Sequence, residues 1–334
     1  MEYRKLGKTG LEVGAISFGG IPLQMCEKDE AVAIIRKAIE LGVNFFDNAR
    51  LYNGSEDLMG EGFAGLRDKV IIASKSMAKD AETMERDVNL SLKALKTDYI
   101  DLYQMHNVHI SELPKVLGPG GAFETLIKLK KAGTIGHIGI TSHSLDTIKN
   151  VLDIDEIETI QYPYSVVERQ AEEVFAEAAR KGKGVLAMKP LAGGALMDAK
   201  RAIRFIYENR NVTCSIPGMM SLQQLEDNLS VAEMPDLTKE EKEVLFAEAD
   251  SLGQKFCRRC GYCAPCPQGI NIPMCFITEG YYTRYDLKEW ATERYGSLVA
   301  KAGDCTKCGA CEPKCPYDLP IRDMLESVKT IFGK

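Results

Sequence analysis

The sequence contains no hydrophobic run long enough to cross a membrane and no run of basic residues. A membrane-spanning helix needs about 20 consecutive apolar residues, and no apolar stretch here approaches that length. The first residues, MEYRKLGKTGLEVG, also lack the apolar region of a signal peptide. The net charge of −6 argues against a nucleic-acid partner held through its phosphates. We therefore expect a cytoplasmic protein, without a membrane or nucleic-acid partner, that acts on small molecules or exchanges electrons with a redox protein.

Cysteine is almost absent from the first three quarters of the chain. Only Cys26 and Cys214 occur before residue 250, whereas nine of the eleven cysteines follow residue 256. This change in composition marks a domain boundary, and a length of 334 residues is consistent with two domains. We expect one domain over residues 1–235, a connecting helix over 236–254 and a second domain over 255–334.

The later cysteines form two dense runs, each ending in Cys-Pro. The second run reads CxxCxxCxxxCP, the bacterial ferredoxin spacing, in which three thiolates hold one cluster and the fourth cysteine reaches the neighbouring cluster. Disulfides and paired zinc sites are alternatives for tandem CxxC pairs, but neither explains the Cys-Pro endings. The runs therefore predict two 4Fe-4S clusters, with the ligands Cys257, Cys260, Cys263, Cys266, Cys305, Cys308, Cys311 and Cys315.

The first run departs from the ferredoxin spacing. Two residues separate Cys263 from Cys266, where the ferredoxin pattern has three. If Cys266 does not reach its cluster, Cys275 could replace it or one cluster could be absent; a structural thiol in the core is the other interpretation of Cys275. Crossed ligation would combine Cys257, Cys260 and Cys263 with Cys315, and Cys305, Cys308 and Cys311 with Cys266.

Short apolar runs alternate with amphipathic stretches through the first 235 residues. Eight such alternations in about 230 residues fit an α/β fold of the closed (β/α)8 TIM-barrel type better than an open doubly wound sheet. Helix candidates show apolar residues at three- and four-residue spacing. The predicted strands are 13–20, 43–49, 69–75, 99–106, 135–142, 159–164, 184–191 and 213–219, and the predicted helices include 28–41, 81–95, 122–131, 171–180 and 237–252.

A GxGxxG string at Gly60, Gly62 and Gly65 resembles a dinucleotide-binding loop in its letters alone. A phosphate-binding loop of this kind follows a strand and opens a helix. Here the string follows a helical stretch and precedes a strand, so its glycines are better explained as a helix end and a turn.

Four residues with catalytic potential lie at or after the ends of successive predicted strands. Asp47 ends the second strand, Tyr52 follows in the next loop, Lys75 ends the third strand and His106 ends the fourth. Catalytic groups of parallel barrels come from these positions. Each residue alone also has a structural explanation: a loop cap, a packed aromatic, a solvated lysine and a buried histidine.

Together these residues resemble the Asp, Tyr, Lys, His tetrad of the aldo-keto reductases. The similarity runs from residue 1 to near residue 232 and includes YRKLGKTGLEVGAISFGG, FFDNARLYNGSEDLMG and IPGMMSLQQLEDNL. The remainder resembles a small, mainly α-helical two-cluster ferredoxin domain, an extension that a subgroup of this family carries. The resemblance implies an oxidoreductase that reduces a carbonyl, or oxidises an alcohol, with NAD(P)H.

The tetrad residue types suit this chemistry. Reduction of a carbonyl by hydride requires a proton donor, and a tyrosine with its usual pKa near 10 gives up a proton reluctantly. A nearby ammonium favours the phenolate, so Lys75 beside Tyr52 makes the tyrosine a better acid. Asp47 would pair with Lys75, and His106 would orient the substrate carbonyl or share in proton delivery.

By the same resemblance, a nicotinamide lies across the barrel mouth, with Ser142 and Gln161 holding its carboxamide. At the end of the seventh strand, where the family usually stacks an aromatic residue on the nicotinamide, this chain has Met188. A thioether packs on a ring less rigidly than an aromatic side chain. The following residue, Lys189, adds a positive charge at the mouth, with a solvated surface lysine as the alternative interpretation.

The contacts to a 2′-phosphate also depart from the family pattern. The lysine and arginine that grip this phosphate of NADPH are replaced by Gly218 and Gln224. Each lost charge-assisted hydrogen bond is worth about 1.5–3 kcal/mol. NADH is therefore expected to fit at least as well as NADPH, and Asn228 stands where the family contacts the adenine side.

Hydride transfer moves two electrons together, whereas each 4Fe-4S cluster passes one at a time. One hypothesis is that the clusters carry electrons between a protein partner and a redox cofactor in the barrel, such as a flavin, although no flavin fingerprint is readable. A second makes the clusters structural parts of a nicotinamide-dependent reductase. A third, disfavoured by the intact tetrad, makes the barrel a non-catalytic binding module.

Overall fold

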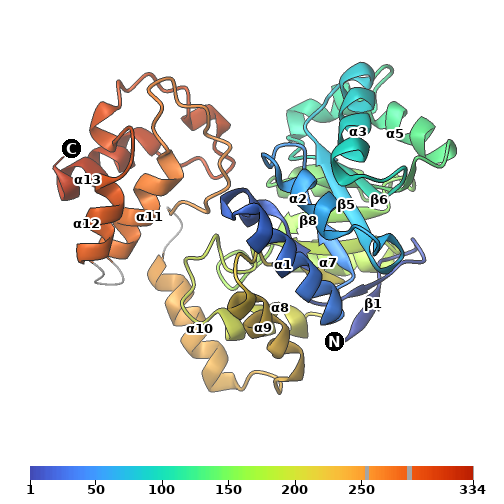
Figure 1. Cartoon of the computed structure of the whole chain (residues 1–334), viewed down its shortest axis with the longest axis horizontal. Helices are drawn as coiled ribbons and strands as arrows, with labels where there is room; N and C mark the ends of the chain where they lie inside the picture. Colours follow the sequence, from blue (N-terminus) through green and yellow to red (C-terminus); the bar gives the residue numbers. More distant parts are fainter. Residues whose placement is uncertain (253–255, 284–287, 334) are drawn as a thin grey trace. The chain divides into compact units, whose positions relative to one another are not determined.

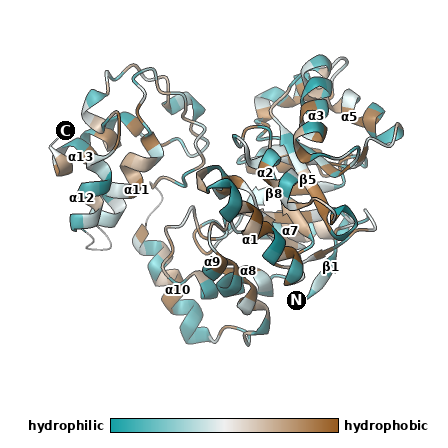
Figure 2. Ribbon diagram, in the orientation of Figure 1, coloured by the Kyte–Doolittle hydropathy of each residue, from teal (hydrophilic) through white to brown (hydrophobic). Residues whose placement is uncertain are grey.

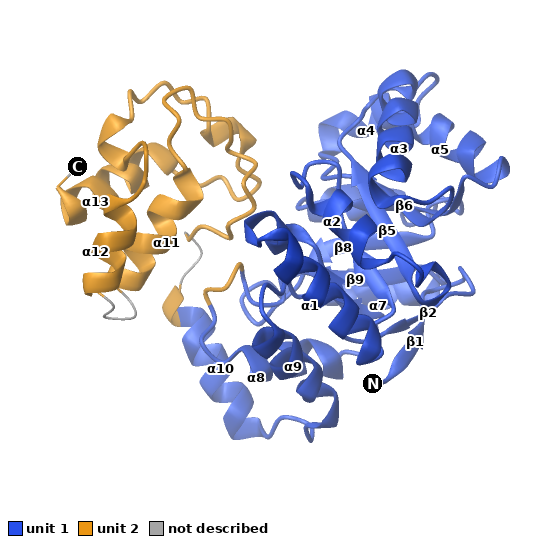
Figure 3. Cartoon of the chain, in the orientation of Figure 1, with its two compact units in different colours: residues 1–192, 196–250 blue, residues 193–195, 251–334 orange. Residues whose placement is uncertain are grey.

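The chain forms two compact units in a computed structural model that describes residues 1–252, 256–283 and 288–333. The barrel unit comprises residues 1–192 and 196–250, and the cysteine-rich unit comprises residues 193–195 and 251–334 (Figure 3). Residues 253–254, the end of the predicted connecting segment, lie outside the described residues, as does residue 255. Within the described ranges, no helix has the length and apolar character needed to cross a membrane.

Eight parallel strands form the sheet of the barrel unit, in the order β10-β9-β8-β7-β6-β5-β4-β3. Figure 1 labels β5, β6 and β8 among them. The two edges of this sheet are joined, because the Ser17 N–H donates to the Ser215 carbonyl at 2.9 Å and the Gly19 N–H to the Pro217 carbonyl at 2.9 Å. The predicted (β/α)8 barrel and its eight strands are thus confirmed, except that residues 13–14 of the first predicted strand belong to a separate antiparallel strand. The strands are β3 (Phe18–Gly19), β4 (Phe45–Asp47), β5 (Ile71–Ser76), β6 (Ile100–Met105), β7 (Ile135–Thr141), β8 (Thr159–Pro163), β9 (Gly184–Met188) and β10 (Cys214–Ser215).

Helices follow the strands, and their apolar faces form one core with the outward side chains of the sheet. Ile35, Val88 and Phe175 from three helices are fully buried in the same cluster as Phe46 and Tyr103 from the strands. Figure 2 shows both hydrophobic and hydrophilic residues on helices such as α1 and α3, as amphipathic helices require. These helices are α1 (Lys28–Glu40), α2 (Ser55–Gly62), α3 (Ala81–Leu95), α4 (Leu113–Leu117), α5 (Ala122–Lys131), α6 (Leu145–Val151), α7 (Glu172–Arg180), α8 (Ala199–Glu208) and α9 (Leu222–Ser230).

A hairpin that the sequence analysis did not identify plugs the end of the barrel at which the strands begin. Its antiparallel strands are β1 (Tyr3–Lys5) and β2 (Glu12–Gly14). Leu6 and Val13 are fully buried with Phe45, Leu186 and Cys214 inside the barrel. The hairpin therefore leaves the opposite end, where the strands finish, for a functional site.

The connecting helix belongs to the barrel unit rather than forming a separate linker. The helix α10 (Lys239–Leu252) lies on α8, because Glu241 accepts a hydrogen bond from Arg201 at 3.0 Å and Lys242 pairs with Glu208 at 2.8 Å. The rings of Phe205 and Phe246 also meet edge to face. These contacts extend the barrel unit to residue 250, beyond the boundary expected at 235.

The cysteine-rich unit is mainly helical, as predicted. Its helices are α11 (Ile272–Thr283), α12 (Lys288–Gly296) and α13 (Ile321–Phe332). Ile272, Leu325 and Val328 form its core, and the rings of Tyr295 and Phe332 stack at 4.2 Å. Cysteines line this core, so the same side chains that would bind clusters also contact its apolar residues.

The glycines of the GxGxxG string serve helix packing and a turn. Gly60 and Gly62 lie within α2, which extends beyond the predicted helical stretch. A Cβ atom on Gly60 would lie 2.4 Å from the Ala94 carbonyl oxygen, and one on Gly62 would lie 2.6 Å from the Ile35 side chain. Gly65 has a φ of +75° in the turn toward β5. The glycines thus let α2 approach α1 and α3 closely.

Replacing Gly60 by alanine should lower the free energy of unfolding of the barrel unit by about 1–3 kcal/mol, because the new methyl group meets backbone atoms of α3. Denaturant unfolding followed by circular dichroism measures this change. The exposed Asp57 on the same helix provides the control, since Asp57→Ala should stay within about 0.5 kcal/mol of the wild type. Equal stability of Gly60→Ala and Asp57→Ala would contradict the packing role of Gly60.

Candidate functional site

The four predicted catalytic residues meet at the end of the barrel where the strands finish. The Lys75 ammonium lies 2.7 Å from the Asp47 carboxylate and 5.2 Å from the centre of the Tyr52 ring. The Tyr52 and His106 rings meet edge to face, with centroids 6.0 Å apart. The structure therefore brings together an acid–base candidate, a cation, its counter-ion and an imidazole.

The two-residue period of the strands explains why these side chains point inward. Phe45 on β4, Ala73 on β5 and Leu102 on β6 face the interior of the barrel, and alternate residues of a strand share one face. Asp47 and Lys75 each follow two residues after such an interior residue. The inward-facing side chains of these strands are therefore apolar near the hairpin and polar at the end where the strands finish.

Two amides complete this polar row and hold the Asp47 carboxylate. Gln104 on β6 donates to Asp47 Oδ1 at 3.3 Å and to Gln161 Oε1 at 2.9 Å, and Gln161 on β8 donates to Asp47 Oδ2 at 3.4 Å. The Lys75 ammonium also donates to the Asn48 carbonyl at 2.5 Å. The sequence analysis did not identify Gln104 as a site residue. Its two-residue spacing from Leu102 and His106 nevertheless places it on the same strand face as those residues.

The Asp47–Lys75 pair is almost completely removed from water, with exposed fractions of 2% and 1%. Burial raises the pKa of Asp47 and lowers the pKa of Lys75, and the attraction between the two groups opposes both shifts. Burying charges is costly unless they are paired and hydrogen-bonded. The two amides and the Asn48 carbonyl supply that compensation, so Lys75 is held in a fixed position beneath Tyr52.

His106 is a neutral imidazole at the same site. Burial lowers its pKa well below the usual range, and the positive charges of Lys75 and Lys189 lower it further. A neutral imidazole carries one N–H donor and one acceptor nitrogen. His106 is therefore suited to donate a hydrogen bond to a carbonyl oxygen rather than to act as a cation.

A second histidine at the barrel mouth was missed by the sequence analysis. His143 follows β7, and its Nδ1 lies 2.8 Å from the Asn107 side-chain oxygen. Since an amide oxygen only accepts, His143 Nδ1 carries the proton. Burial lowers the pKa of His143 well below its usual range, with contributions from Lys189 and His106. Lys189 itself has a φ of +57°, an unusual conformation for a non-glycine residue at the end of β9.

The nicotinamide candidates lie at the ends of three neighbouring strands. The Ser142 hydroxyl after β7 donates to the Val108 carbonyl at 2.6 Å and accepts from the Ser144 N–H at 2.9 Å. Gln161 takes part in the Asp47 network, and Met188 ends β9 with its side chain packed against the interior core. These residues share the open end of the barrel with the tetrad.

The residues at the positions where the family contacts the 2′-phosphate and the adenine form a separate group after β10. Gly218 pairs with Gly19, and a Cβ atom on Gly218 would lie 2.5 Å from the Pro22 ring. The Gln224 side chain accepts from the Met220 N–H at 2.9 Å, and Asn228 is buried farther along α9. The α9 sequence, LQQLEDNLS, carries no basic residue that could replace the family lysine and arginine.

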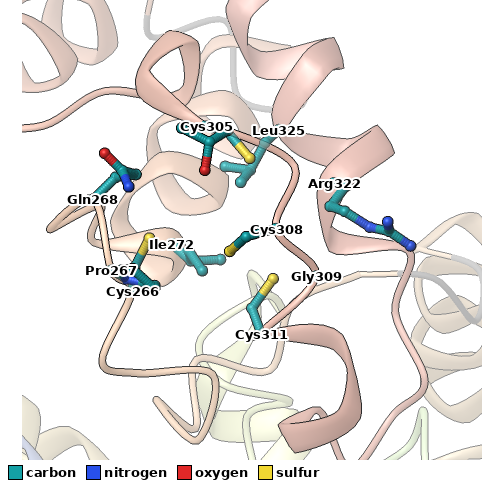
Figure 4. Close-up of a pocket in the computed structure, with 11 residues that line it drawn as sticks. Cys266, Pro267, Gln268, Ile272, Cys305, Cys308, Gly309, Cys311, Arg322 and Leu325 are labelled. Carbon is teal, nitrogen blue, oxygen red and sulfur yellow. The ribbon is translucent and has the colours of Figure 1, made fainter.

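Four cysteines from both runs line one pocket of the cysteine-rich unit. Figure 4 shows the thiols of Cys266, Cys305, Cys308 and Cys311 around this pocket, together with Ile272 and Leu325. This is one of the two sets that crossed ligation predicts. Cys275 does not line the pocket; it is fully buried in α11, where burial raises the pKa of its thiol to about 12.

The other predicted set also gathers in the cysteine-rich unit. Burial, together with the neighbouring thiols Cys260, Cys257 and Cys315, raises the pKa of the Cys263 thiol to about 12. Backbone hydrogen bonds from Leu319 and Tyr317 to Cys315 oppose the rise that burial causes in the pKa of that thiol. Each cysteine run thus supplies three thiols to one set and one thiol to the other.

The two runs share one backbone conformation around their first cysteines. The Arg259 N–H donates to Cys257 Sγ at 3.4 Å, and the Lys307 N–H donates to Cys305 Sγ at 3.4 Å. Arg259 and Lys307 have φ angles of +58° and +55°, which are strained for residues with a Cβ atom. Gly261 and Gly309, two residues further on in each run, are also left-handed, at +78° and +76°. This repeated turn directs backbone donors at sulfur, as cluster-binding loops do.

The donor set fits iron–sulfur clusters better than single ions. In the part of the chain that the structure describes, no three His, Cys, Asp or Glu side chains converge closely enough to hold one metal ion. A cubane instead needs one thiolate at each of four iron corners, spread around a cavity. Four thiols around the pocket, beside the apolar side chains of Ile272 and Leu325, match that requirement.

Comparison with family models divides the chain in the same way as the structure. The model of the aldo/keto reductase family matches residues 11–202. The model of a 4Fe-4S dicluster domain matches residues 256–320, which contain all eight predicted cluster ligands. The first match covers the strands that carry the tetrad, from β3 to β9.

Individual relatives cover about two thirds to three quarters of the chain. L-galactose dehydrogenase from Arabidopsis thaliana is 29% identical over 302 residues, covering 75% of this chain and 94% of its own. Aldo-keto reductase YhdN from Bacillus subtilis is 30% identical over 229 residues, covering 62% and 67%. The solved structure of aldo-keto reductase AKR11C1 from Bacillus halodurans, in its holo form, has a TM-score of 0.66 at 27% identity and covers 75% of this chain and 96% of its own.

Replacing Lys75 by methionine should leave the Asp47 carboxylate buried without its counter-ion. We expect the free energy of unfolding to fall by about 3–5 kcal/mol at pH 8. Because burial raises the folded-state pKa of Asp47, the carboxyl group becomes protonated as the pH falls, and the loss should shrink toward pH 5. Urea unfolding at the two pH values measures the difference.

The double variant Asp47→Asn/Lys75→Met is the control, because it removes both charges from the barrel. It should be more stable than Lys75→Met at pH 8 and should lack the pH-dependent recovery. A loss of stability in Lys75→Met that is equal at both pH values would contradict an uncompensated Asp47 carboxylate.

Proposed function

The chain belongs to the aldo/keto reductase family of NAD(P)H-dependent oxidoreductases, and on that premise we propose that its Asp47, Tyr52, Lys75 and His106 site reduces a small-molecule carbonyl or oxidises the corresponding alcohol. The observation that carries this proposal is the buried Asp47–Lys75 pair next to the Tyr52 ring and the neutral His106. A barrel that merely binds a ligand has no need to bury two charges at its mouth, since such a pair contributes little net stability.

Each tetrad residue has a role that follows from its surroundings. Tyr52 supplies the proton to the carbonyl oxygen, and the Lys75 ammonium stabilises the phenolate left behind. Asp47 keeps the ammonium in place, and the neutral imidazole of His106 donates a hydrogen bond that orients the carbonyl. When bound, the nicotinamide supplies the hydride.

The residues at the mouth fit a nicotinamide dinucleotide without a strong requirement for a 2′-phosphate. Ser142 and Gln161 would hold the carboxamide, and the Met188 thioether would pack on the ring. Gly218 and Gln224 offer no positive charge, and α9 has no basic residue to replace them. We propose that NADH serves at least as well as NADPH, with Asn228 on the adenine side.

We propose two 4Fe-4S clusters in the cysteine-rich unit, held by crossed sets of thiolates. The arrangement of thiols in two groups of four supports this assignment, as does the match to a dicluster domain. One group comprises Cys266, Cys305, Cys308 and Cys311, and the other comprises Cys257, Cys260, Cys263 and Cys315. The clusters would connect the reductase to a one-electron redox protein partner.

Replacing Tyr52 by phenylalanine removes the proton donor while keeping the ring. We expect kcat/KM for a carbonyl substrate to fall by about 10²–10⁴-fold. Anaerobic NADH and NADPH oxidation, measured with a panel of aldehydes and ketones, gives the rates, and quenching of protein fluorescence checks that the dinucleotide still binds. The exposed Tyr3, whose hydroxyl bonds the Gly42 carbonyl, provides Tyr3→Phe as the control. Unchanged turnover of every carbonyl by Tyr52→Phe would contradict the proposed role.

The two candidate fourth ligands of the pocket cluster can be distinguished by iron content. Anaerobically purified Cys266→Ser should lose about half of the iron and sulfide, because one of two clusters loses a thiolate ligand. Cys275→Ala should keep both clusters, since Cys275 is buried in the core outside the pocket. Iron loss in Cys275→Ala without loss in Cys266→Ser would assign the ligand to Cys275 instead.

A further inference from the structure

Glu56 is a buried carboxylate next to the tetrad but not part of it. Its exposed fraction is 2%, and it lies in the first turn of α2, four residues after Tyr52. The Ser74 hydroxyl donates to Glu56 Oε1 at 2.5 Å, and the Arg50 guanidinium pairs with Glu56 Oε2. A buried charge is costly unless it is paired and hydrogen-bonded. Glu56 is therefore held as a paired carboxylate against β5.

The partners of Glu56 belong to the two segments that carry Tyr52 and Lys75. Arg50 lies in the loop between β4 and α2, two residues before Tyr52, and its backbone N–H donates to the Lys75 carbonyl at 2.9 Å. Ser74 immediately precedes Lys75 on β5 and, by the two-residue period of the strand, faces away from the barrel interior. Glu56 thus ties the Tyr52 loop to the strand of Lys75 from the outer side of the sheet.

Glu56 also acts on Lys75 through its charge. Burial lowers the pKa of Lys75, and the carboxylates of Asp47 and Glu56 oppose that fall. Asp47 contacts the ammonium inside the barrel, whereas Glu56 acts from the other face of the sheet. A protonated Lys75 is the form that stabilises the phenolate of Tyr52.

The other ionisable groups around this pair keep one charge state near neutral pH. His106 is neutral, because burial lowers its pKa well below the usual range. Tyr103 on β6 is neutral, because burial raises its pKa. The Asp87 carboxylate on α3 attracts the Arg50 guanidinium, which stays protonated. Removing the charge of Glu56 therefore changes the field at the tetrad without changing the charges of these neighbours.

We propose that Glu56 is a positioning residue for Tyr52 and Lys75. Through Arg50 and Ser74 it fixes the loop of the proton donor on the strand of the ammonium. Its negative charge also keeps that ammonium protonated. Glu56 thereby serves the proposed carbonyl reduction, on which this assignment rests, through its neighbours rather than at the reacting atoms.

Glu56→Gln and Glu56→Asp separate the charge of this side chain from its shape. Glu56→Gln keeps an acceptor for Ser74 but removes the charge, so kcat for carbonyl reduction should fall about 10–100-fold at pH 7 with little change in KM. Loss of an anion should also let the first proton leave the Tyr52–Lys75 pair at lower pH, so the alkaline fall in kcat should begin earlier. Glu56→Asp keeps the charge and should keep the wild-type pH profile.

These rates are measured anaerobically with NADH and the aldehyde or ketone that the wild type reduces fastest, after circular dichroism has shown that each variant is folded. Glu61→Gln is the matched control, because Glu61 lies on the same helix but pairs with Lys28 and Lys96. It should leave kcat and the pH profile unchanged. A wild-type kcat and pH profile in folded Glu56→Gln would overturn the role of Glu56. A wild type that reduces no carbonyl would instead overturn the proposed function.

Ser74→Ala tests the tie to β5 if Glu56→Gln does not fold. This variant removes one hydrogen bond from Glu56 and leaves its ion pair with Arg50. We expect kcat to fall about three- to tenfold, because a charge-assisted hydrogen bond is lost, and the pH profile to stay that of the wild type. An unchanged kcat in Ser74→Ala would overturn the tie between the Tyr52 loop and β5.

Discussion

The ion pair between Asp47 and Lys75 is the constraint on which the candidate active site depends. Two charges inside a barrel are costly to desolvate, so the neighbouring strands have to supply hydrogen-bonding groups at that depth. Gln104 and Gln161 do so from β6 and β8, and the Asn48 carbonyl does so from the end of β4. The tetrad is therefore a property of the closed barrel, because residues from strands on several sides have to converge on one carboxylate.

The strands and the tetrad were predictable from the sequence because their signals are local. An apolar run that ends in Asp47 or Lys75 marks both a strand and its open end. Gln104 was missed although its two-residue spacing from Leu102 and His106 places it on their strand face; the structure shows that this face is the interior one. The β1–β2 hairpin escaped because two strands of three residues carry almost no periodic signal. The extent of the barrel unit depended on long-range pairs such as Arg201–Glu241.

In the cysteine runs, too, some features were predictable from the local sequence and others depend on contacts between distant segments. Spacing alone predicted the ligands and suggested that the runs exchange their fourth cysteines, and the pocket around Cys266 and Cys308 agrees with that suggestion. The left-handed turns at Arg259 and Lys307 were not predictable, since neither residue is a glycine. The contact of Arg258 with Tyr317 joins segments almost sixty residues apart, so no local pattern could indicate it. The local sequence therefore predicts the cluster ligands, whereas tertiary contacts determine which residues surround them.

The hairpin beneath the barrel has a consequence for the order of events in a catalytic cycle. Leu6 and Val13 fill the end at which the strands begin, so the proposed dinucleotide and substrate would share the opening at the other end. Of two molecules that use one entrance, the one that binds deeper has to arrive first and depart last. A short pair of strands at the plugged end would thereby impose an order on binding and release, and the departure of the deeper molecule would become a step that can limit turnover.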